Sequence, residues 1–578
     1  MKKVFYALMI TVGLMFGSCD DDLLVKTPLD QISDPQFWKT DGDLELYVNK
    51  LYETFSSQAW SGVGAGGGPF PDLGTDQAIA LSNAIGTKNR MDGVVTVPTT
   101  GGGWSWTNVR NANYFLENAE RVTTGANKDQ YIGEGYFFRA WFYFDLLKQF
   151  GDLPIITKAL SVSDEDILYG ARSSRTDVVN FIISDLDLAI SKMKPKSGVA
   201  AGRLHKDVAL LFKSRVCLYE GTWEKYHQGT PFAGKTNGTE FLNLAAASAK
   251  AVIDGGIFSL TTGNPNNVYY ELFNQIDLTN NKEVLFWKQY NWITFGDNFG
   301  NQMWNWPHGS GYTREFVRSY LASDGLPISV SPLYKGDADL RNVTVNRDPR
   351  LAQTIMTPGD PLTISLKNDT TKFVTPWLTG QMGPTGYESQ KWRRPQLDPQ
   401  RGDYSQDLAW IHFRYAEALL NYAEAKAEIG QLTQEDVDMT INKLRQRVGM
   451  PNLVLSSITT DPEWLDYGYT LTPALQEIRR ERTVELAAEG HRLNDVMRWR
   501  AHNLFVGKRP KGTKYTDEFK TINPNLKQDS EGYLDPYSSP VLTGPGSTWG
   551  FDPNKHYLLP LPVNELTINP NLKQNPGY

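Results

Sequence analysis

The sequence predicts a mainly α-helical protein on a scaffold of tetratricopeptide-like helical hairpins, with a long loop-rich insertion at about 259–405 that contains short β-strands. Apolar residues recur every three and four positions through most of 41–258, and this spacing returns after residue 407. Between these zones the chain is rich in Gly, Asn, Pro and Trp. The paired amphipathic helices, rich in Ala and Tyr, favour hairpins, although a strict repeat of about 34 residues is absent.

The first helical zone has clear start and stop signals. Helices are expected over 131–150, 174–193, 205–222 and 241–254. Gly151 follows the last apolar residue of the first of these helices and is expected to end it. Ser174 and Asp177 have the spacing of a capping box at the start of the second. In the insertion, Val284 to Trp287 is expected to form a short strand.

The second zone combines apolar and charged stripes. Helices are expected over 407–430, 434–448 and 473–489. One face of the first carries the polar residues Arg414, Glu417, Asn421, Glu424 and Glu428. Thr472 and Pro473 form a cap and first-turn pair for the third. The acidic and basic residues of 477–500 lie one or two turns apart, which suits ion pairs between helices and argues against catalysis by Glu481 and Glu485.

Composition excludes several classes of protein. The 578 residues include 65 acidic and 58 basic side chains, a net charge of −7, and 40% hydrophobic residues, as in an ordered globular protein. A mildly acidic chain is a poor nucleic-acid binder, because phosphate neutralisation needs clustered Lys and Arg. Two cysteines cannot build a disulfide scaffold, and Cys217, on a helical pattern, is expected to be a small buried apolar residue.

The N-terminus has the features of an export signal. Lys2 and Lys3 precede an apolar run too short to span a bilayer, and the run ends at Gly17-Ser18-Cys19. This ending resembles the lipobox of bacterial lipoproteins, which implies a signal peptide over 1–18 and lipidation of Cys19. A lipid tether and N-terminal segment would then occupy 19–40, followed by one domain over 41–578. The acidic triplet 20–22 resembles the signal that sends some lipoproteins to the exterior of the outer membrane.

Two glycine-rich matches to nucleotide-binding patterns lack the required context. Residues 229–236 satisfy the phosphate-loop pattern, but a helix pattern precedes them in place of a strand, and Pro231 lies inside the loop. Residues 62–67 match the dinucleotide pattern, but Pro69 and Pro71 prevent a following helix. The seven histidines lack zinc-site spacing, so no cofactor is expected. Asp-rich turns such as 398–407 leave room for a structural calcium ion.

Aromatic residues in loop-like segments are the candidate ligand-binding residues. Sugars present C–H patches and hydroxyl edges, so their sites combine aromatic platforms with a few polar groups. The candidates are Trp60, Trp104, Trp292, Trp304, Trp306, His308, Tyr312, Trp392 and Arg393. The cluster from 292 to 312 is interleaved with asparagines. Trp106, Trp141, Trp499 and Tyr578 are interpreted as packing residues, and Arg393 and Arg394 suit either acidic sugars or acids of the scaffold.

Six sequence blocks together resemble one family. They are VRNANYFLENA (109–119), FFRAWFYFDLLKQFGDLPII (137–156), FRYAEALLNYAEA (413–425), INKLRQRVGMP (441–451), IRRERTVELAAEGHRLNDVMRWR (478–500) and YLLPLPVNELTINPNLKQNPGY (557–578). In this order, behind a lipobox, they resemble the SusD/RagB family of nutrient-binding outer-membrane lipoproteins. Leu561 stands where family members often carry Ile.

The resemblance implies a binding protein at the cell surface. It implies capture of a nutrient, usually a glycan and in some members a peptide, and transfer to a SusC-like TonB-dependent transporter of the outer membrane. We therefore expect a binding protein, not an enzyme. Three alternatives stay open: a peptide-binding member of the family, a secreted glycoside hydrolase or lyase on the same scaffold, and a lid or adaptor whose only partner is the transporter.

Overall fold

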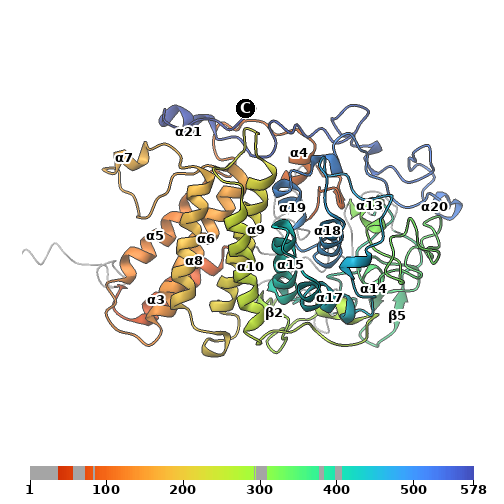
Figure 1. Ribbon diagram of the computed structural model, residues 1–578, viewed down its shortest axis with the longest axis horizontal. Helices are drawn as coiled ribbons and strands as arrows, with labels where there is room; N and C mark the ends of the chain where they lie inside the picture. Colours follow the sequence, from red (N-terminus) through yellow and green to blue (C-terminus); the bar gives the residue numbers. More distant parts are fainter. Residues whose placement is uncertain are drawn as a thin grey trace, which may run out of the picture.

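The computed structural model describes residues 37–55, 72–82, 85–291, 293–294, 309–376, 383–397 and 407–578. Figure 1 shows two groups of helices side by side, with loops and small strands beyond the second group. The signal peptide, Cys19 and the glycine-rich segment 62–67 lie outside the described residues. So does the turn at 398–407, apart from its last residue.

The first group contains the longest helices. In chain order, the described elements up to residue 254 are α3 (Asp41–Tyr52), β1 (Ala78–Ala80), α4 (Gly86–Met91), α5 (Thr107–Ala119), α6 (Lys128–Phe150), α7 (Glu165–Leu168), α8 (Arg175–Lys192), α9 (Lys206–Tyr226) and α10 (Thr239–Asp254). Two of them lie outside the first group: β1 pairs with β3 (Ser310–Tyr312), and Figure 1 shows α4 above the second group. The expected helices over 131–150, 174–193, 205–222 and 241–254 are therefore confirmed. Gly151 ends α6 at a φ of 72°, and the Ser174 side chain caps α8 by accepting a hydrogen bond from Asp177 N.

The middle zone consists of short elements joined by long loops. They are α11 (Val268–Leu272), β2 (Val284–Lys288), β3 (Ser310–Tyr312), α13 (Arg314–Arg318), α14 (Pro349–Ala352), β4 (Pro361–Ile364) and β5 (Thr370–Lys372). The described strands form three two-stranded antiparallel sheets. In these sheets β1 pairs with β3, β2 pairs with β6 (Trp410–Arg414), and β4 pairs with β5. The expected strand at 284–287 and the loop-rich character of the insertion are confirmed.

The second group continues from the β2–β6 pair. Its helices are α15 (Tyr415–Glu428), α16 (Gln434–Met439), α17 (Ile441–Arg447), α18 (Pro473–Glu485) and α19 (Arg492–Arg498), followed by α20 (Asp517–Ile522) and α21 (Val563–Ile568). Thr472 caps α18, and Pro473 takes its first turn, as expected.

Three expected boundaries in this group are wrong. The helix expected over 407–430 begins only at Tyr415, because residues 410–414 pair with β2 as a strand. The helix expected over 434–448 is divided at Thr440, whose φ of −122° and ψ of −85° are not helical. The helix expected over 473–489 ends at Glu485, and Ala488 has a φ of 58° that no right-handed helix permits.

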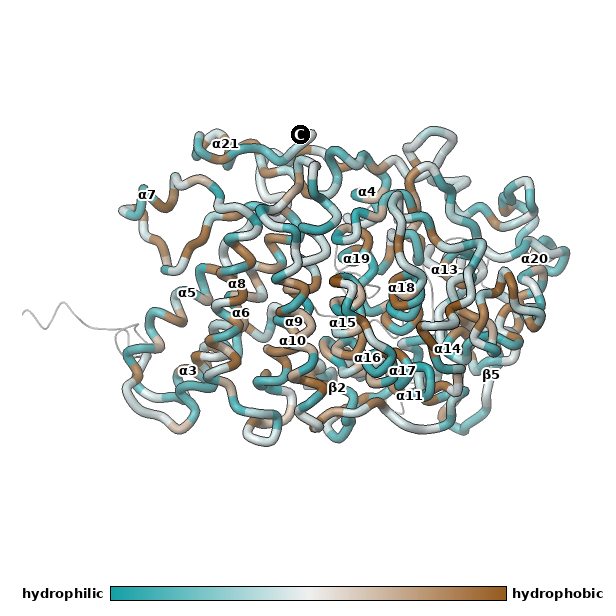
Figure 2. Tube along the Cα trace, viewed as in Figure 1, coloured by the Kyte–Doolittle hydropathy of each residue, from teal (hydrophilic) through white to brown (hydrophobic). Residues whose placement is uncertain are grey.

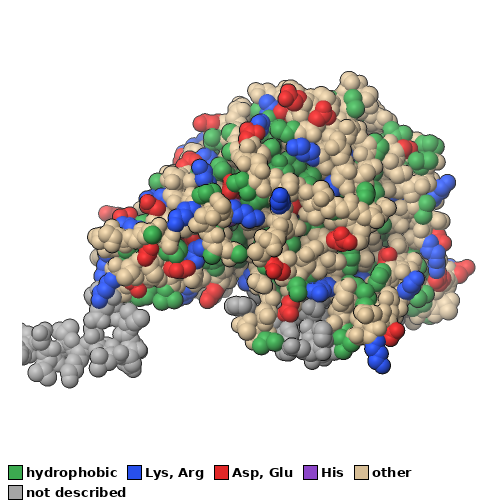
Figure 3. Space-filling view, turned by 90° about the horizontal axis from the view of Figure 1, so that it is seen from below, with side chains coloured by type: hydrophobic (Ala, Val, Ile, Leu, Met, Phe, Trp, Pro, Cys, Tyr) green, Lys and Arg blue, Asp and Glu red, His purple; other side chains and the backbone are tan. Residues whose placement is uncertain are grey.

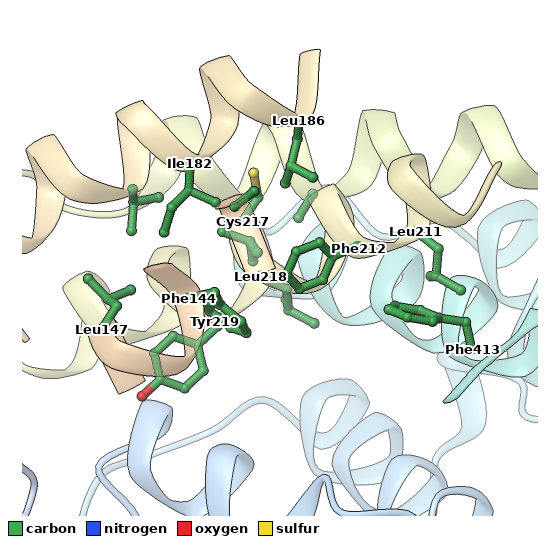
Figure 4. Packing of buried hydrophobic residues seen from close by; sticks show 14 of the residues in the cluster. Phe144, Leu147, Ile182, Leu186, Leu211, Phe212, Cys217, Leu218, Tyr219 and Phe413 are labelled. Atoms are coloured by element: carbon green, nitrogen blue, oxygen red, sulfur yellow. The ribbon is translucent and has the colours of Figure 1, made fainter. Parts of the chain in front are cut away.

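The long helices build one continuous apolar core. In it α8 packs against α6 and α9, and α10 packs against α9 and α15, so the first group is joined directly to the second. Figure 4 shows Cys217 of α9 among aliphatic and aromatic side chains such as Leu186 of α8. Cys217 is a fully buried free thiol, as expected, and burial raises its pKa to about 12. Figure 2 shows hydrophobic stretches recurring along these helices.

Buried ion pairs hold the second group together. Glu485 of α18 accepts hydrogen bonds from Arg350 Nη1 at 2.9 Å, Arg414 Nη1 at 2.7 Å and Arg447 Nη2 at 2.7 Å. These arginines belong to α14, β6 and α17, so one carboxylate ties three other elements to α18. Arg350 also pairs with Glu481. The ion pairs expected between helices are confirmed, and the arginines hold the pKa of Glu485 well below its ordinary value despite burial.

The 229–236 loop is structural. It joins α9 to α10 and wraps the buried carboxylate of Glu224, which accepts a hydrogen bond from Thr236 N at 2.8 Å. A Cβ on Gly234 would lie 2.2 Å from Glu224 Oε1, so the glycine permits this close approach. No buried strand precedes the loop, because α9 ends at Tyr226. The rejection of a phosphate loop is thereby confirmed.

The surface has a mixed charge. On the face seen in Figure 3, acidic and basic side chains are interspersed over the scaffold. Among the helices in the described part of the chain, none is both long and apolar enough to span a membrane.

Replacing Glu485 by Gln should strongly destabilise the protein. The change leaves three buried arginines facing a neutral amide, and removal of one partner from a buried ion pair costs about 3–5 kcal/mol. We expect a lower urea midpoint, measured by circular dichroism. The matched control is Glu240→Gln at an exposed position, with an expected effect within about 0.5 kcal/mol. Equal midpoints for the two variants would contradict a structural role for the network.

Candidate ligand-binding site

A cavity of about 220 Å³ lies where the two groups of helices meet. Its walls come from α6 and α9 on one side and from β6, α15, α19 and the turn after α18 on the other. The lining residues are Trp141, Phe144, Lys148, Arg215, Leu218, Tyr219, Trp410, Ile411, His412, Asn421, Arg482, Glu489, Gly490, His491, Asn494, Asp495 and Arg498.

Two tryptophans give the cavity an aromatic wall. Trp141 of α6 is half-buried and packs against Phe55 and Phe212, with ring centroids 5.2 and 5.0 Å away. Trp410 of β6 is held from behind by Trp392, whose ring stacks on it at 4.1 Å. Rings fixed in this way lose little conformational entropy when they meet a ligand, and they suit the C–H face of a sugar.

Two polar atoms on the cavity lining have no hydrogen-bond partner among the described residues. They are His412 Nε2 and Asn421 Nδ2. Asn421 is fully buried, and its Oδ1 accepts a hydrogen bond from Arg482 Nη1 at 2.9 Å, which fixes the amide so that Nδ2 is left to donate. Leaving a buried donor unsatisfied costs about 1–3 kcal/mol. Both atoms are buried, so neither is exposed on the surface of the cavity.

The two histidines of the cavity are neutral at physiological pH. Burial, followed by the charges of Lys288 and Arg215, lowers the pKa of His412 to about 3. Burial, followed by nearby arginines, also holds the pKa of His491 well below its ordinary value. A neutral imidazole both donates and accepts hydrogen bonds, which suits hydroxyl groups.

The carboxylates on the lining are already engaged. Glu489 accepts hydrogen bonds from Arg414 and Lys391 at both oxygens, between 2.6 and 2.7 Å. Asp495 accepts from Arg482 at 2.8 Å and from Arg498 at 2.9 Å. A general acid in glycoside hydrolysis needs a protonated carboxyl beside the scissile bond. Both carboxylates are instead held by basic side chains of the scaffold.

Residues on either side of the segment with Trp60, and a residue shortly before Trp292, lie beside this cavity. Phe55 precedes the segment with Trp60 and lies 5.1 Å from the ring of His412. Asp72 follows that segment, and its carboxylate accepts hydrogen bonds from the backbone of Gly490 and Arg492. Lys288, shortly before Trp292, pairs with Trp410 in the β2–β6 ladder. Trp60, Trp292, Trp304, Trp306 and His308 themselves lie outside the described residues.

The other expected site residues are packing residues. Trp392 is fully buried and donates from Nε1 to Ala488 O at 2.9 Å. Arg393 is 1% exposed and donates to the carbonyl of Leu362 at 2.9 Å. Trp104 packs edge-on against Phe150, and Tyr312 is buried on β3 with its hydroxyl 3.2 Å from Ser389 Oγ. The expectation that these four side chains are open to ligand is therefore corrected, because each fills the core.

Sequence reasoning missed the cavity residues. The interpretation of Trp141 as a packing residue is confirmed by its ring contacts with Phe55 and Phe212, but its place on a cavity wall was not predicted. Asn421 was placed on a polar face of its helix, and it is buried in the structure. The sequence does contain a signal for these residues. Asn421 and His412 are uncharged polar residues in a segment whose other residues are apolar or can form ion pairs. Such residues in a core are expected to have a partner.

Comparison with known proteins assigns the chain to a family. The model described as "SusD family" matches residues 272–578, more than half of the chain, and one described as "Starch-binding associating with outer membrane" matches 96–218. SusD-like protein P2 of Formosa agariphila is 24% identical over 602 residues, covering 100% of both chains. The chain belongs to the SusD family, and the resemblance found in its sequence is confirmed.

Solved structures share the fold. A SusD-like carbohydrate-binding protein from Bacteroides fragilis superposes with a TM-score of 0.70 at 23% identity, covering 93% of this chain and 100% of that chain. A laminarin-binding SusD-like protein gives a TM-score of 0.54 at 18% identity, covering 94% and 100%. These likenesses support the expected mainly helical, tetratricopeptide-like scaffold.

His412 should make the fold sensitive to acid. Its folded pKa of about 3 lies below the unfolded value of about 6.5, so below pH 6.5 the unfolded chain binds a proton that the folded chain refuses. Stability is therefore lost as pH falls from about 6.5 toward 3. Between pH 7 and pH 5, urea unfolding should show a smaller loss for His412→Gln than for the unaltered protein, by about 1–2 kcal/mol. Equal losses would contradict the neutral, buried imidazole.

Proposed function

We propose that this protein captures an oligosaccharide or polysaccharide at the cell surface and delivers it to a SusC-like TonB-dependent transporter of the outer membrane. The observation that carries the proposal is the cavity between the helix groups of a SusD-family scaffold, which is lined by both aromatic and polar side chains. A sugar needs both kinds of group, because its ring faces are apolar and its edges carry hydroxyls.

Relatives of the chain support the ligand class. The Bacteroides fragilis structure is of a carbohydrate-binding protein, and another structural neighbour binds laminarin. One of the two matching family models concerns starch binding in association with the outer membrane. In this chain, the acids lining the cavity are held by cations, which supports binding without chemical change.

The proposed mechanism uses two layers of contact. A terminal sugar enters the cavity, stacks near Trp141 and forms hydrogen bonds with polar side chains of the lining. Sugars further along the ligand contact Trp304, Trp306 and the other loop aromatics, Trp60 and Trp292, with His308 as a hydrogen-bonding neighbour. Several weak contacts along one chain add up to useful affinity while each remains easy to release.

The last part of the proposed function is attachment of the protein to the outer membrane through a lipid on Cys19. Signal cleavage after residue 18 and acylation of Cys19 would attach the body to the outer membrane, facing the exterior. More than one acyl chain is needed for stable anchoring. The segment 19–40 would act as the tether that keeps the body close to its transporter.

Loss of two tryptophans should weaken ligand binding. We expect Trp304→Ala combined with Trp306→Ala to weaken glycan binding by the soluble body, residues 20–578, at least tenfold, because two stacking platforms are removed. Tryptophan fluorescence and calorimetry measure the binding, against a panel of oligosaccharides and peptides.

The control is Tyr169→Ala, which removes an exposed aromatic from the α7 region, and it should bind normally. Unchanged binding by the folded double variant would reject those tryptophans as the site. Binding of peptides alone would move the protein to the peptide-binding members of its family. Sugar release from a polysaccharide would show an enzyme.

A further inference from the structure

Two short helices present apolar side chains to solvent. Val162, just before α7, is 91% exposed, and Ile167 and Leu168 of α7 are also exposed. Val563 and Ile568 of α21 are exposed in the same way. No residue of α7 or α21 is buried, so these side chains do not belong to the core. We call these five residues the α7–α21 surface, because apolar residues gathered at a surface mark an interaction site.

The C-terminal segment of the chain fixes the backbone of this surface. Asn569 Nδ2 donates to the carbonyl oxygens of Leu168 at 3.3 Å and Gly170 at 3.0 Å. Asn571 Nδ2 donates to Tyr169 O at 2.8 Å. Figure 1 shows α7 and α21 beside each other along one edge of the molecule. Because the backbone is already held, little conformational entropy is lost when a partner covers the side chains.

The charge beside these apolar residues is mainly acidic. Glu165 and Asp166 lie in the first turn of α7, and Glu565 lies in the first turn of α21. None of the three has an ion pair with another described residue. The C-terminal segment adds one exposed cation, Lys573. A complementary partner is therefore apolar at its centre and basic at its rim.

The same acids disfavour two other occupants. Helices that lie in a lipid surface carry Lys and Arg on their polar face, whereas the polar residues at the start of α7 are Glu165 and Asp166. Two identical copies would use this surface twice, so the acids of one copy would approach those of the other. Like charges brought together oppose association.

We infer that the α7–α21 surface docks on the transporter, at an extracellular groove that is apolar and rimmed by Lys or Arg; this inference rests on the proposed function. The described lining of the ligand cavity includes no residue of α7 or α21. Docking through this surface therefore leaves the described cavity wall to the ligand.

The first test measures how much transporter copurifies with the protein. The tagged full chain is extracted from the outer membrane of its own cells in mild detergent, and the TonB-dependent transporter retained with it is quantified by mass spectrometry. Val162→Asp combined with Leu168→Asp should reduce the retained transporter at least tenfold, because each new carboxylate would lose its water in an apolar groove.

The matched control is Ile257→Asp combined with Val454→Asp, at positions 46% and 44% exposed against 43% for Leu168. It should retain as much transporter as the unaltered chain. Circular dichroism and urea midpoints verify that both double variants are folded. Equal retention by the Val162–Leu168 variant would overturn the docking surface and leave the proposed function standing. No transporter retained by the unaltered chain would overturn both.

A second experiment identifies the neighbour of the surface. Benzoylphenylalanine in place of Leu168, activated by light in intact cells, should form a cross-link to the transporter. A cross-link to lipid, or to a second copy of this chain, would overturn the inference, and so would the absence of any cross-link.

A third experiment tests the basic rim. Glu165→Lys combined with Asp166→Lys reverses the charge of the first turn of α7 and should reduce the retained transporter at least threefold, since like charges would then meet. The control is Glu240→Lys combined with Glu435→Lys, at exposed acids in the first turns of α10 and α16. Equal retention by the two variants would overturn the charge complementarity.

Discussion

The buried carboxylate of Glu485 is the constraint on which the second half of the scaffold depends. Three arginines from α14, β6 and α17 converge on it, and Arg414 continues the network to Glu489 at the cavity wall. Buried ion pairs add little net stability compared with apolar packing, but a broken pair is costly, so such a network specifies one arrangement of its elements. Here that arrangement fixes the turn after α18, which forms one wall of the cavity.

The same kind of pairing is found at the cavity, whose lining includes both basic and acidic side chains. Arginines brought into the interior need acids, and the acids they recruit are then unavailable for proton transfer. Trp410 and Asn421 are buried in the wall of the cavity, and Trp141 is half-buried there.

Local sequence signals predicted the long helices well. Apolar periodicity located α6, α8, α9 and α10, and capping residues located the start of α18. They failed at β6, because strand pairing with β2 is a long-range contact that periodicity does not reveal. They failed at the cavity for a similar reason: Trp141 and Asn421 are 280 positions apart in the sequence and meet only when α6 and α15 pack around α9. Trp392 and Arg393 were expected at the surface because their segment has a loop-like composition, but both are buried.

A crystal structure of the mature chain with a bound neutral oligosaccharide tests the central claim most directly. The account predicts a sugar ring in the cavity, with hydroxyl oxygens about 2.7–3.2 Å from polar atoms of the lining and a ring face toward Trp141. A sugar bound elsewhere, with only water between α6 and α15, would contradict it.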